Sequence, residues 1–112
     1  MKKGDIWWAS LGEPMGSEPG YRRPIVVISS NDFNQSKIRT VIVAIITSNL
    51  HLADAPGNFI LSKKNTGLDR DSVLNISQLM TLDKLFLTER IGNLSNKQLN
   101  FLDDSIKLVL NL

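Results

Sequence analysis

Eight consecutive residues, 40–47 (TVIVAIIT), constrain the fold more than any other segment of this 112-residue chain. Every residue of the run except Ala44 is β-branched, which favours a strand over a short core helix, the alternative for an apolar run of this length. A strand that lacks polar alternation has both of its faces covered by other parts of the protein. The run therefore predicts a central strand around which the remaining segments pack.

Further short strands are expected on both sides of this run, because β-branched and aromatic segments alternate with turn residues. The expected strands are residues 6–9, 24–30, 58–61, 72–76 (which 78–81 could continue) and 89–93. The expected connections are a long loop at 11–20 with five Gly and Pro residues, a turn or short helical piece at 31–36, a loop at 51–58 and a charged turn at 62–71. The adjacent tryptophans Trp7 and Trp8 face opposite sides of the first strand, so one of them belongs to the core.

The C-terminal segment carries a helical pattern. Ser95 is followed three residues later by Gln98, which is the signature of a capping box at a helix start. Leu99, Leu102 and Ile106 then recur at helical spacing, so we expect a helix over residues 96–110. The sequence thus predicts one domain over residues 1–112, mainly β with a C-terminal helix, arranged as a small barrel or strongly bent sheet.

Composition excludes several classes of protein. The formal charge is only +2, so any nucleic-acid contact must be local, and the absence of cysteine excludes a thiol nucleophile or a thiolate zinc site. No metal motif occurs, and the single histidine, His51, lacks the second histidine of a paired acid–base mechanism and reads as a solvated loop residue. Without a membrane-length or signal-length apolar run, the sequence predicts a soluble cytoplasmic protein.

Polar residues at the ends of the predicted strands are the candidates for chemistry. Arg23 precedes Pro24 between the long loop and a buried strand, and a guanidinium there is suited to bind phosphate, although a surface salt bridge is the alternative. Thr47 ends the central strand and Asn49 follows it, where they line a cleft or simply terminate the strand. Gln78 follows another strand and could contact a base edge or the protein backbone.

Six segments, together with the terminal helix, resemble the MazF/PemK family of toxins in the same order. They are residues 4–7 (GDIW), 16–18 (GSE), 23–28 (RPIVVI), 43–48 (VAIITS), 67–73 (GLDRDSV), and Gln78 followed by 81–84 (TLDK). The resemblance covers essentially the whole chain. It implies a small SH3-like (PemK-like) barrel and a homodimer.

The resemblance also implies an activity: sequence-specific cleavage of single-stranded RNA, without metal or other cofactor, to 2′,3′-cyclic phosphate and 5′-OH ends. Arg23 then binds the scissile phosphate and stabilises the charge that develops on it, and Thr47 hydrogen-bonds the phosphate or orients the 2′-OH. By position, Ser17, Glu18, Asn49 and Gln78 are expected to contact the substrate. The expected protein partner is a MazE-like antitoxin whose acidic, disordered segment covers the Arg23 and Thr47 region.

The sequence departs from one branch of this family. Some Kid/PemK-type members carry a histidine where Ser17 stands, and an arginine and an aspartate where Asn75 and Ser77 stand. This chain is therefore closer to the branch that relies on arginine and threonine.

Two other functions remain as alternatives. A CcdB-like toxin that poisons gyrase ends in Trp-Gly-Ile, whereas this chain ends in Leu110-Asn111-Leu112. A non-catalytic SH3-like module that binds proline-rich peptides needs an aromatic groove, and the chain contains only seven aromatic residues.

Overall fold

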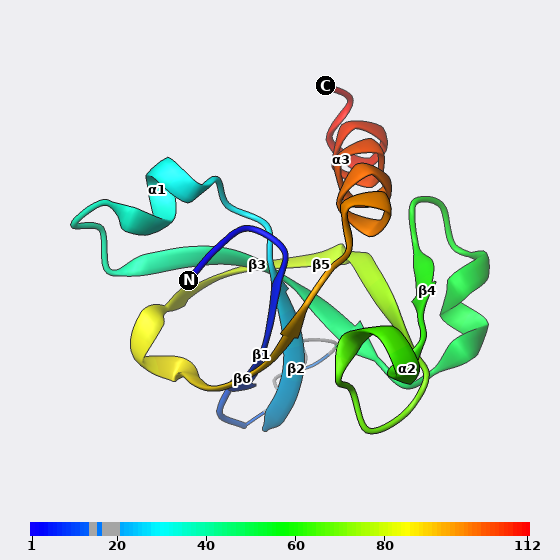
Figure 1. Cartoon of the computed structure of the whole chain (residues 1–112), viewed down its shortest axis with the longest axis horizontal. Coiled ribbons are helices and arrows are strands. Elements are labelled where there is room, and N and C mark those ends of the chain that lie inside the picture. The colour runs from blue at the N-terminus through cyan, green and yellow to red at the C-terminus, as the bar shows by residue number, and fades with distance from the viewer. Residues whose placement is uncertain (14–15, 17–20) are drawn as a thin grey trace.

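The computed structural model describes residues 1–13, 16 and 21–112 and contains, within them, one antiparallel sheet with helices at its rim (Figure 1). The strands are β1 (Asp5–Ser10), β2 (Arg22–Val27), β3 (Thr40–Thr47), β4 (Phe59–Leu61), β5 (Ser72–Asp83) and β6 (Leu87–Asn93). The helices are α1 (Asn31–Gln35), α2 (Lys63–Thr66) and α3 (Asn96–Leu110), and two 3₁₀ turns are η1 (Leu50–Asp54) and η2 (Lys84–Phe86). The expected fold class, mainly β with a C-terminal helix, is confirmed, and the barrel takes the form of a curled half-barrel.

Strand β3 occupies the interior of the sheet, whose strand order is β4-β5-β3-β2-β1-β6. It has the predicted bounds, and both of its faces are buried. Val43 and Ile45 belong to one core cluster, and Ala44 and Ile46 belong to a second cluster on the other face. This arrangement explains why the strand carries no polar alternation.

Strand β5 bends the sheet. It pairs with β3 through Ala44–Leu79 and then Ile45–Asn75, so three residues of β5, 76–78, bulge out between consecutive positions of β3. A bulge of this kind increases local twist and bend. The sequence pattern indicated two short strands on either side of this point, and the structure joins them as one strand interrupted by the bulge.

Helix α3 begins and ends where the sequence predicts. The Ser95 hydroxyl accepts a hydrogen bond from the Gln98 backbone N–H (3.2 Å), and the Gln98 side chain accepts one from the Ser95 N–H (2.8 Å). This is the reciprocal capping box. Leu102 is fully buried in the core cluster that also contains Ala44 and Ile46, so the helix covers one face of the sheet.

Two segments expected to be irregular contain helical turns. Within 51–58, most of η1 replaces the start of the loop, because the Asn49 side chain accepts a hydrogen bond from the His51 N–H (3.2 Å) and caps the turn. Within 62–71, α2 forms behind an analogous cap, in which the Ser62 hydroxyl accepts a hydrogen bond from the Lys64 N–H (3.3 Å).

Strand β2 differs from its predicted bounds, because it covers Arg22–Val27 instead of 24–30. Across the described residues, no helix is long and apolar enough to cross a membrane.

Candidate active site and adjoining cleft

Strand register brings Arg23 and Thr47 to the same face of the sheet. Strands β2 and β3 pair Ile25 with Ile45 and Val27 with Val43. Arg23 lies two residues before Ile25 and Thr47 lies two residues after Ile45, so the alternation of side chains along each strand directs both to the face of this pair. Both therefore lie at the end of their strands on the side of Ile25 and Ile45, which we call the Arg23–Thr47 face.

The bulge in β5 adds two amides to this face. Asn75 pairs with Ile45, so it lies on the same face, and it is buried. Its Oδ1 accepts hydrogen bonds from the Ser77 hydroxyl (2.7 Å) and Asn58 Nδ2 (3.2 Å), while its Nδ2 donates to Gln78 Oε1 (3.1 Å). The predicted substrate contact Gln78 is thus half-buried and held near the face by Asn75.

Thr47 and Asn49 have distinct local roles. The Thr47 hydroxyl accepts a hydrogen bond from the Asn49 backbone N–H (3.2 Å), which fixes its position at the strand end. A hydroxyl that accepts one bond still has a hydrogen to donate to a phosphate or ribose oxygen. Asn49 is exposed, and its side-chain oxygen caps η1 through the His51 N–H. Its two amide hydrogens are therefore the part suited to contact a ligand.

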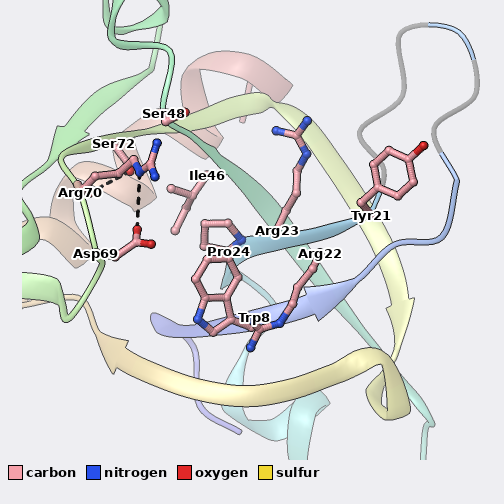
Figure 2. A pocket seen from close by; sticks show the side chains of 10 residues that line it. All are labelled: Trp8, Tyr21, Arg22, Arg23, Pro24, Ile46, Ser48, Asp69, Arg70 and Ser72. Atoms are coloured by element: carbon pink, nitrogen blue, oxygen red, sulfur yellow. Dashed lines mark hydrogen bonds and ion pairs between the residues drawn. The ribbon is translucent and has the colours of Figure 1, made fainter.

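A cleft of about 300 Å³ opens at the same end of the sheet, mostly on the opposite face, and Arg23 also borders it. Trp8 pairs with Pro24, and both lie among its lining with Ile46 from the neighbouring strand. Figure 2 shows Arg22 and Arg23 pointing to opposite sides of β2, as alternate strand residues do. The described residues that line the cleft are Trp8, Tyr21, Arg22, Arg23, Pro24, Ile46, Ser48, Asp69, Arg70 and Ser72.

The cleft is rich in guanidinium groups. Arg22 lies over the Trp8 ring at 4.4 Å from its centroid and donates to Glu89 Oε2 at 3.0 Å. On the other side of the cleft, Arg70 Nε lies 3.8 Å from Asp69 Oδ1, at the outer limit of an ion pair. Asp69 is the one carboxylate among the described lining residues. This arrangement is suited to bind an anion.

The remaining candidate residues lie apart from this face or outside the described part of the chain. Ser17 and Glu18 lie outside the described residues. His51 is exposed at the start of η1. Where the chain is described, no group of three His, Cys, Asp or Glu side chains gathers in a way that could hold a metal ion.

Sequence reasoning did not single out the individual side chains Trp8, Arg22 and Arg70 as parts of one cleft. Trp8 and Arg22 come from adjacent strands, and Arg70 comes from the loop between α2 and β5. The signal that could have found Trp8 and Arg22 is strand register. Trp8 lies opposite Pro24, and Arg22, two residues before Pro24, lies on the same face of the sheet. Trp7, on the other face, packs against the core, as the sequence predicted for one of the two tryptophans.

Comparison with known proteins agrees with this architecture. The family model of the "PemK-like, MazF-like toxin of type II toxin-antitoxin system" matches residues 2–110. Endoribonuclease MazF2 of Mycobacterium bovis is 44% identical over 112 residues, which cover 100% of this chain and 98% of the relative.

Two solved structures have the same fold. A Mycobacterium tuberculosis toxin, MazF-mt6, aligns with a TM-score of 0.80 at 21% identity and covers 96% of this chain and 97% of its own. An endoribonuclease from a mycobacterial species, in complex with its cognate antitoxin, aligns with a TM-score of 0.78 at 19% identity, covering 100% and 94%. The curled sheet with a terminal helix is the fold that this chain shares with these solved toxin and endoribonuclease structures. The chain belongs to the PemK-like, MazF-like toxin family of type II toxin–antitoxin systems.

Proposed function

We propose that this protein is the toxin of a toxin–antitoxin pair and acts as an endoribonuclease on single-stranded RNA. The observation that carries the proposal is that the register of β2 and β3 puts Arg23 and Thr47 on one face, near the ends of these strands, in a chain of this family. A relative that is 44% identical over the full chain is named an endoribonuclease, which supports the same reaction here. The gyrase-poisoning and binding-module alternatives have no comparable support.

In the proposed reaction, the ribose 2′-oxygen attacks the adjacent phosphorus and the bond from phosphorus to the 5′-oxygen breaks. The proton of the 2′-OH is released, and the leaving 5′-oxygen gains a proton. The products are a 2′,3′-cyclic phosphate and a 5′-OH end. This chemistry needs stabilisation of negative charge on the phosphoryl oxygens and in-line placement of the 2′-OH, and it needs no metal.

Arg23 supplies the charge stabilisation in this proposal. A guanidinium keeps its charge and presents paired donors whose geometry matches two phosphoryl oxygens. Pro24, which follows Arg23, restricts the Arg23 backbone to an extended conformation within β2. Thr47, fixed by the Asn49 N–H, orients the 2′-OH or a phosphate oxygen. Ser17, Glu18, Asn49 and Gln78 contact the flanking bases or backbone.

We further infer that the active form is a homodimer in the cytoplasm, inhibited by an antitoxin. Exposed apolar side chains on α3 and β4, including Phe101, Leu108 and Ile60, are the support for a dimer. A structural neighbour occurs in complex with its cognate antitoxin. An acidic, disordered segment of such a partner would cover the Arg23–Thr47 face and exclude RNA from it.

A cleavage assay tests the proposed function. The purified protein is incubated with a long single-stranded RNA in excess EDTA, and the product ends are mapped. We expect discrete cuts with cyclic phosphate and 5′-OH ends, and a rate reduced by about 100- to 1,000-fold in Arg23→Ala, the loss typical when one charge-stabilising donor is removed.

The matched control is Arg39→Ala. Arg39 is exposed and immediately precedes the start of β3, at the other end of this strand from Thr47, so the variant removes the same charge away from the candidate site. We expect this variant to cut at the wild-type rate. If the folded wild-type dimer, free of antitoxin, left the RNA intact, the endoribonuclease assignment would be wrong. Cleavage that required a divalent cation would contradict the metal-independent mechanism.

A further inference from the structure

The cleft beside the Arg23–Thr47 face has the size of a site for a small ligand. Its volume of about 300 Å³ is at the lower end of the range for ligand pockets, about 300–1,000 Å³. Three of its lining groups are flat: the Trp8 indole, the Pro24 ring and the Arg22 guanidinium (Figure 2). The hydroxyls of Ser48 and Ser72 add hydrogen-bonding capacity. A ligand with one planar group and one anionic group fits this chemistry.

Arg22 is held as a flat platform inside the cleft. Its guanidinium carbon lies over the Trp8 ring, 4.4 Å from the centroid, and Glu89 Oε2 accepts a hydrogen bond from Nη2 at 3.0 Å. More than half of the Arg22 side chain, 54%, nevertheless stays exposed. A guanidinium fixed in this way can accept a nucleic-acid base on its outer face, because arginine planes stack on bases as aromatic rings do.

The opposite side of the cleft presents Arg70 on a well-anchored loop. Leu68, just before it, is buried in the core, and the Asp71 carboxylate, just after it, accepts a hydrogen bond from the Lys63 N–H at 2.9 Å. The Ser72 hydroxyl donates to the Arg70 carbonyl oxygen at 3.1 Å. Arg70 is therefore presented to the cleft by a fixed backbone, although its side chain is largely exposed.

The loop is also fixed from behind by β6. Gly67 has φ +83°, and a Cβ there would lie 2.7 Å from the Ile91 carbonyl oxygen. A Cβ on Gly92 would overlap the Thr66 carbonyl oxygen. These two glycines let the backbones of α2 and β6 approach each other closely, which sets the position of the loop that carries Arg70.

The ion pair of Arg70 leaves room for a second anion. Asp69 approaches the Nε edge at 3.8 Å, and both side chains are about two-thirds exposed, at 68% and 66%. A pair of this kind contributes little to stability. The terminal nitrogens of the guanidinium can then hydrogen-bond a phosphate without loss of a strong internal contact.

We propose that this cleft binds one nucleotide of the RNA that flanks the scissile bond, with its base stacked on Arg22 and its phosphate bound by Arg70. The inference rests on the proposed function. The RNA strand would pass over the end of the sheet, from the Arg23–Thr47 face to the cleft, since both lie at the same ends of β2 and β3. An acidic peptide is the less suitable ligand, because carboxylates would use the charges but not the stacked plane of Arg22 over Trp8.

Truncated substrates test this assignment. The shortest RNA that the wild-type protein cuts efficiently is compared with versions shortened by one nucleotide at either end. Removal of the nucleotide bound in the cleft should lower kcat/KM by about ten-fold, the effect of one stacked base. Arg22→Lys keeps the positive charge but loses the planar guanidinium, and Arg70→Ala loses the phosphate contact. Both variants should therefore show the ten-fold lower kcat/KM already with the full-length RNA. Removing the cleft-bound nucleotide from the RNA should then lower their kcat/KM no further. Arg39→Ala is again the matched control.

Fluorescence provides a readout that does not depend on cleavage. The chain has two tryptophans, so Trp7→Phe leaves Trp8 as the sole one. RNA whose ribose at the cut site lacks the 2′-OH should quench Trp8 on binding, and Arg22→Lys and Arg70→Ala in this background should raise the Kd about ten-fold. The cleft assignment would be overturned if kcat/KM of Arg22→Lys and Arg70→Ala fell with RNA truncation as it does in the wild type. It would also be overturned if Arg39→Ala raised the Kd for RNA as much as Arg70→Ala. If the wild-type protein cuts no RNA, the proposed function fails, and an unchanged Trp8 signal then rejects the cleft site as well.

Discussion

Adjacent residues of one strand serve two surfaces in this protein. Arg22 and Arg23 follow each other in β2, and the pleat directs them to opposite faces (Figure 2). We assign catalysis to Arg23 and recognition of a flanking nucleotide to Arg22. A single charged dipeptide thereby contributes to two steps of the proposed activity, cleavage and binding, and both of its side chains border the cleft.

Thr47 gives a prediction at the scale of one hydroxyl group. Thr47→Ser keeps the hydroxyl and should cut RNA within about two- to three-fold of wild type. Thr47→Val preserves the shape but removes the group that orients the reacting atoms, so we expect a loss of about ten- to 100-fold in kcat. Thr47→Val also removes the acceptor of the Asn49 N–H and should lower the free energy of unfolding by about 1 kcal/mol.

The two effects of Thr47→Val are separable by measurement. Single-turnover cleavage at saturating RNA gives the rate, and urea unfolding gives the stability. A Thr47→Val protein that cuts as fast as wild type, while showing the expected loss of stability, would reduce Thr47 to a structural residue. A slow Thr47→Ser would contradict the role of the hydroxyl in orientation.

At the scale of elements, the bulge in β5 has its own polar support. Residues 76–78 have no pairing partners on β3. Asn75, just before them, is buried, with 5% of its surface exposed. It joins Asn58, Ser77 and Gln78 through side-chain hydrogen bonds. Buried networks of this kind specify one arrangement, because an incomplete network leaves costly unpaired groups. We interpret Asn75 as the residue that fixes the bend and the place of Gln78.

Asn75→Leu tests this interpretation. The change leaves the partners of Asn75 without their hydrogen bonds, so the free energy of unfolding should fall by about 2–4 kcal/mol. Ser77 is exposed and contributes one of these hydrogen bonds, so Ser77→Ala should lower the free energy of unfolding by less than about 1.5 kcal/mol. Urea denaturation of both variants measures the difference. Equal stability of Asn75→Leu and wild type would show that the bulge holds without the network.

Elements whose specification is local could be predicted from the sequence. The bounds of β3 follow from its β-branched run, and those of α3 follow from Ser95, Gln98 and the apolar spacing. The bulge in β5 could not be predicted, because it depends on where β3 lies beside it. Likewise η1 and α2 depend on single capping side chains in polar segments, where periodicity is uninformative.

The candidate site divides along the same line. Arg23 and Thr47 are predictable because each marks a strand end and matches a family motif. Their place on one face of the sheet, and the association of Trp8 with Arg22, follow from strand register. Arg70 belongs to a charged turn, a pattern that reads as solvated surface. Its place in the cleft depends on the close packing of Gly67 and Gly92, which no local pattern reveals.

At the scale of the whole molecule, one side carries apolar side chains that the chain itself does not cover. Leu108 is 60% exposed and borders a groove of about 240 Å³ between α3 and the start of β4. Phe101 lies in the same groove, with its ring 5.8 Å from that of Phe59. Apolar surface of this kind on a small domain is typical of a protein interface. It is the surface that we expect to be buried in the homodimer.

Leu108→Asp should convert the dimer to a monomer. Wild-type protein is expected to sediment with about twice the 12.5 kDa mass of the chain, and the variant with the mass of one chain. The control is Leu85→Asp, an equally drastic change at an 85% exposed leucine in η2, the yellow turn that Figure 1 draws on the side away from β4. A monomeric wild-type protein, or a Leu108→Asp that remains dimeric, would contradict this interface.

The alternation of side chains along β2 has a consequence for how such a toxin can change over generations. Replacing Arg22 can retune which RNA is held without altering the group that acts on the phosphate, so specificity and chemistry can drift apart by single substitutions. Insertion or loss of one residue inside β2 has the opposite character. Every later side chain would exchange faces, the buried Ile25 and Val26 would trade neighbours, and both surfaces would be lost together. Within this strand, single substitutions can therefore change the RNA that is bound while the fold is kept, whereas insertions and deletions disrupt both surfaces.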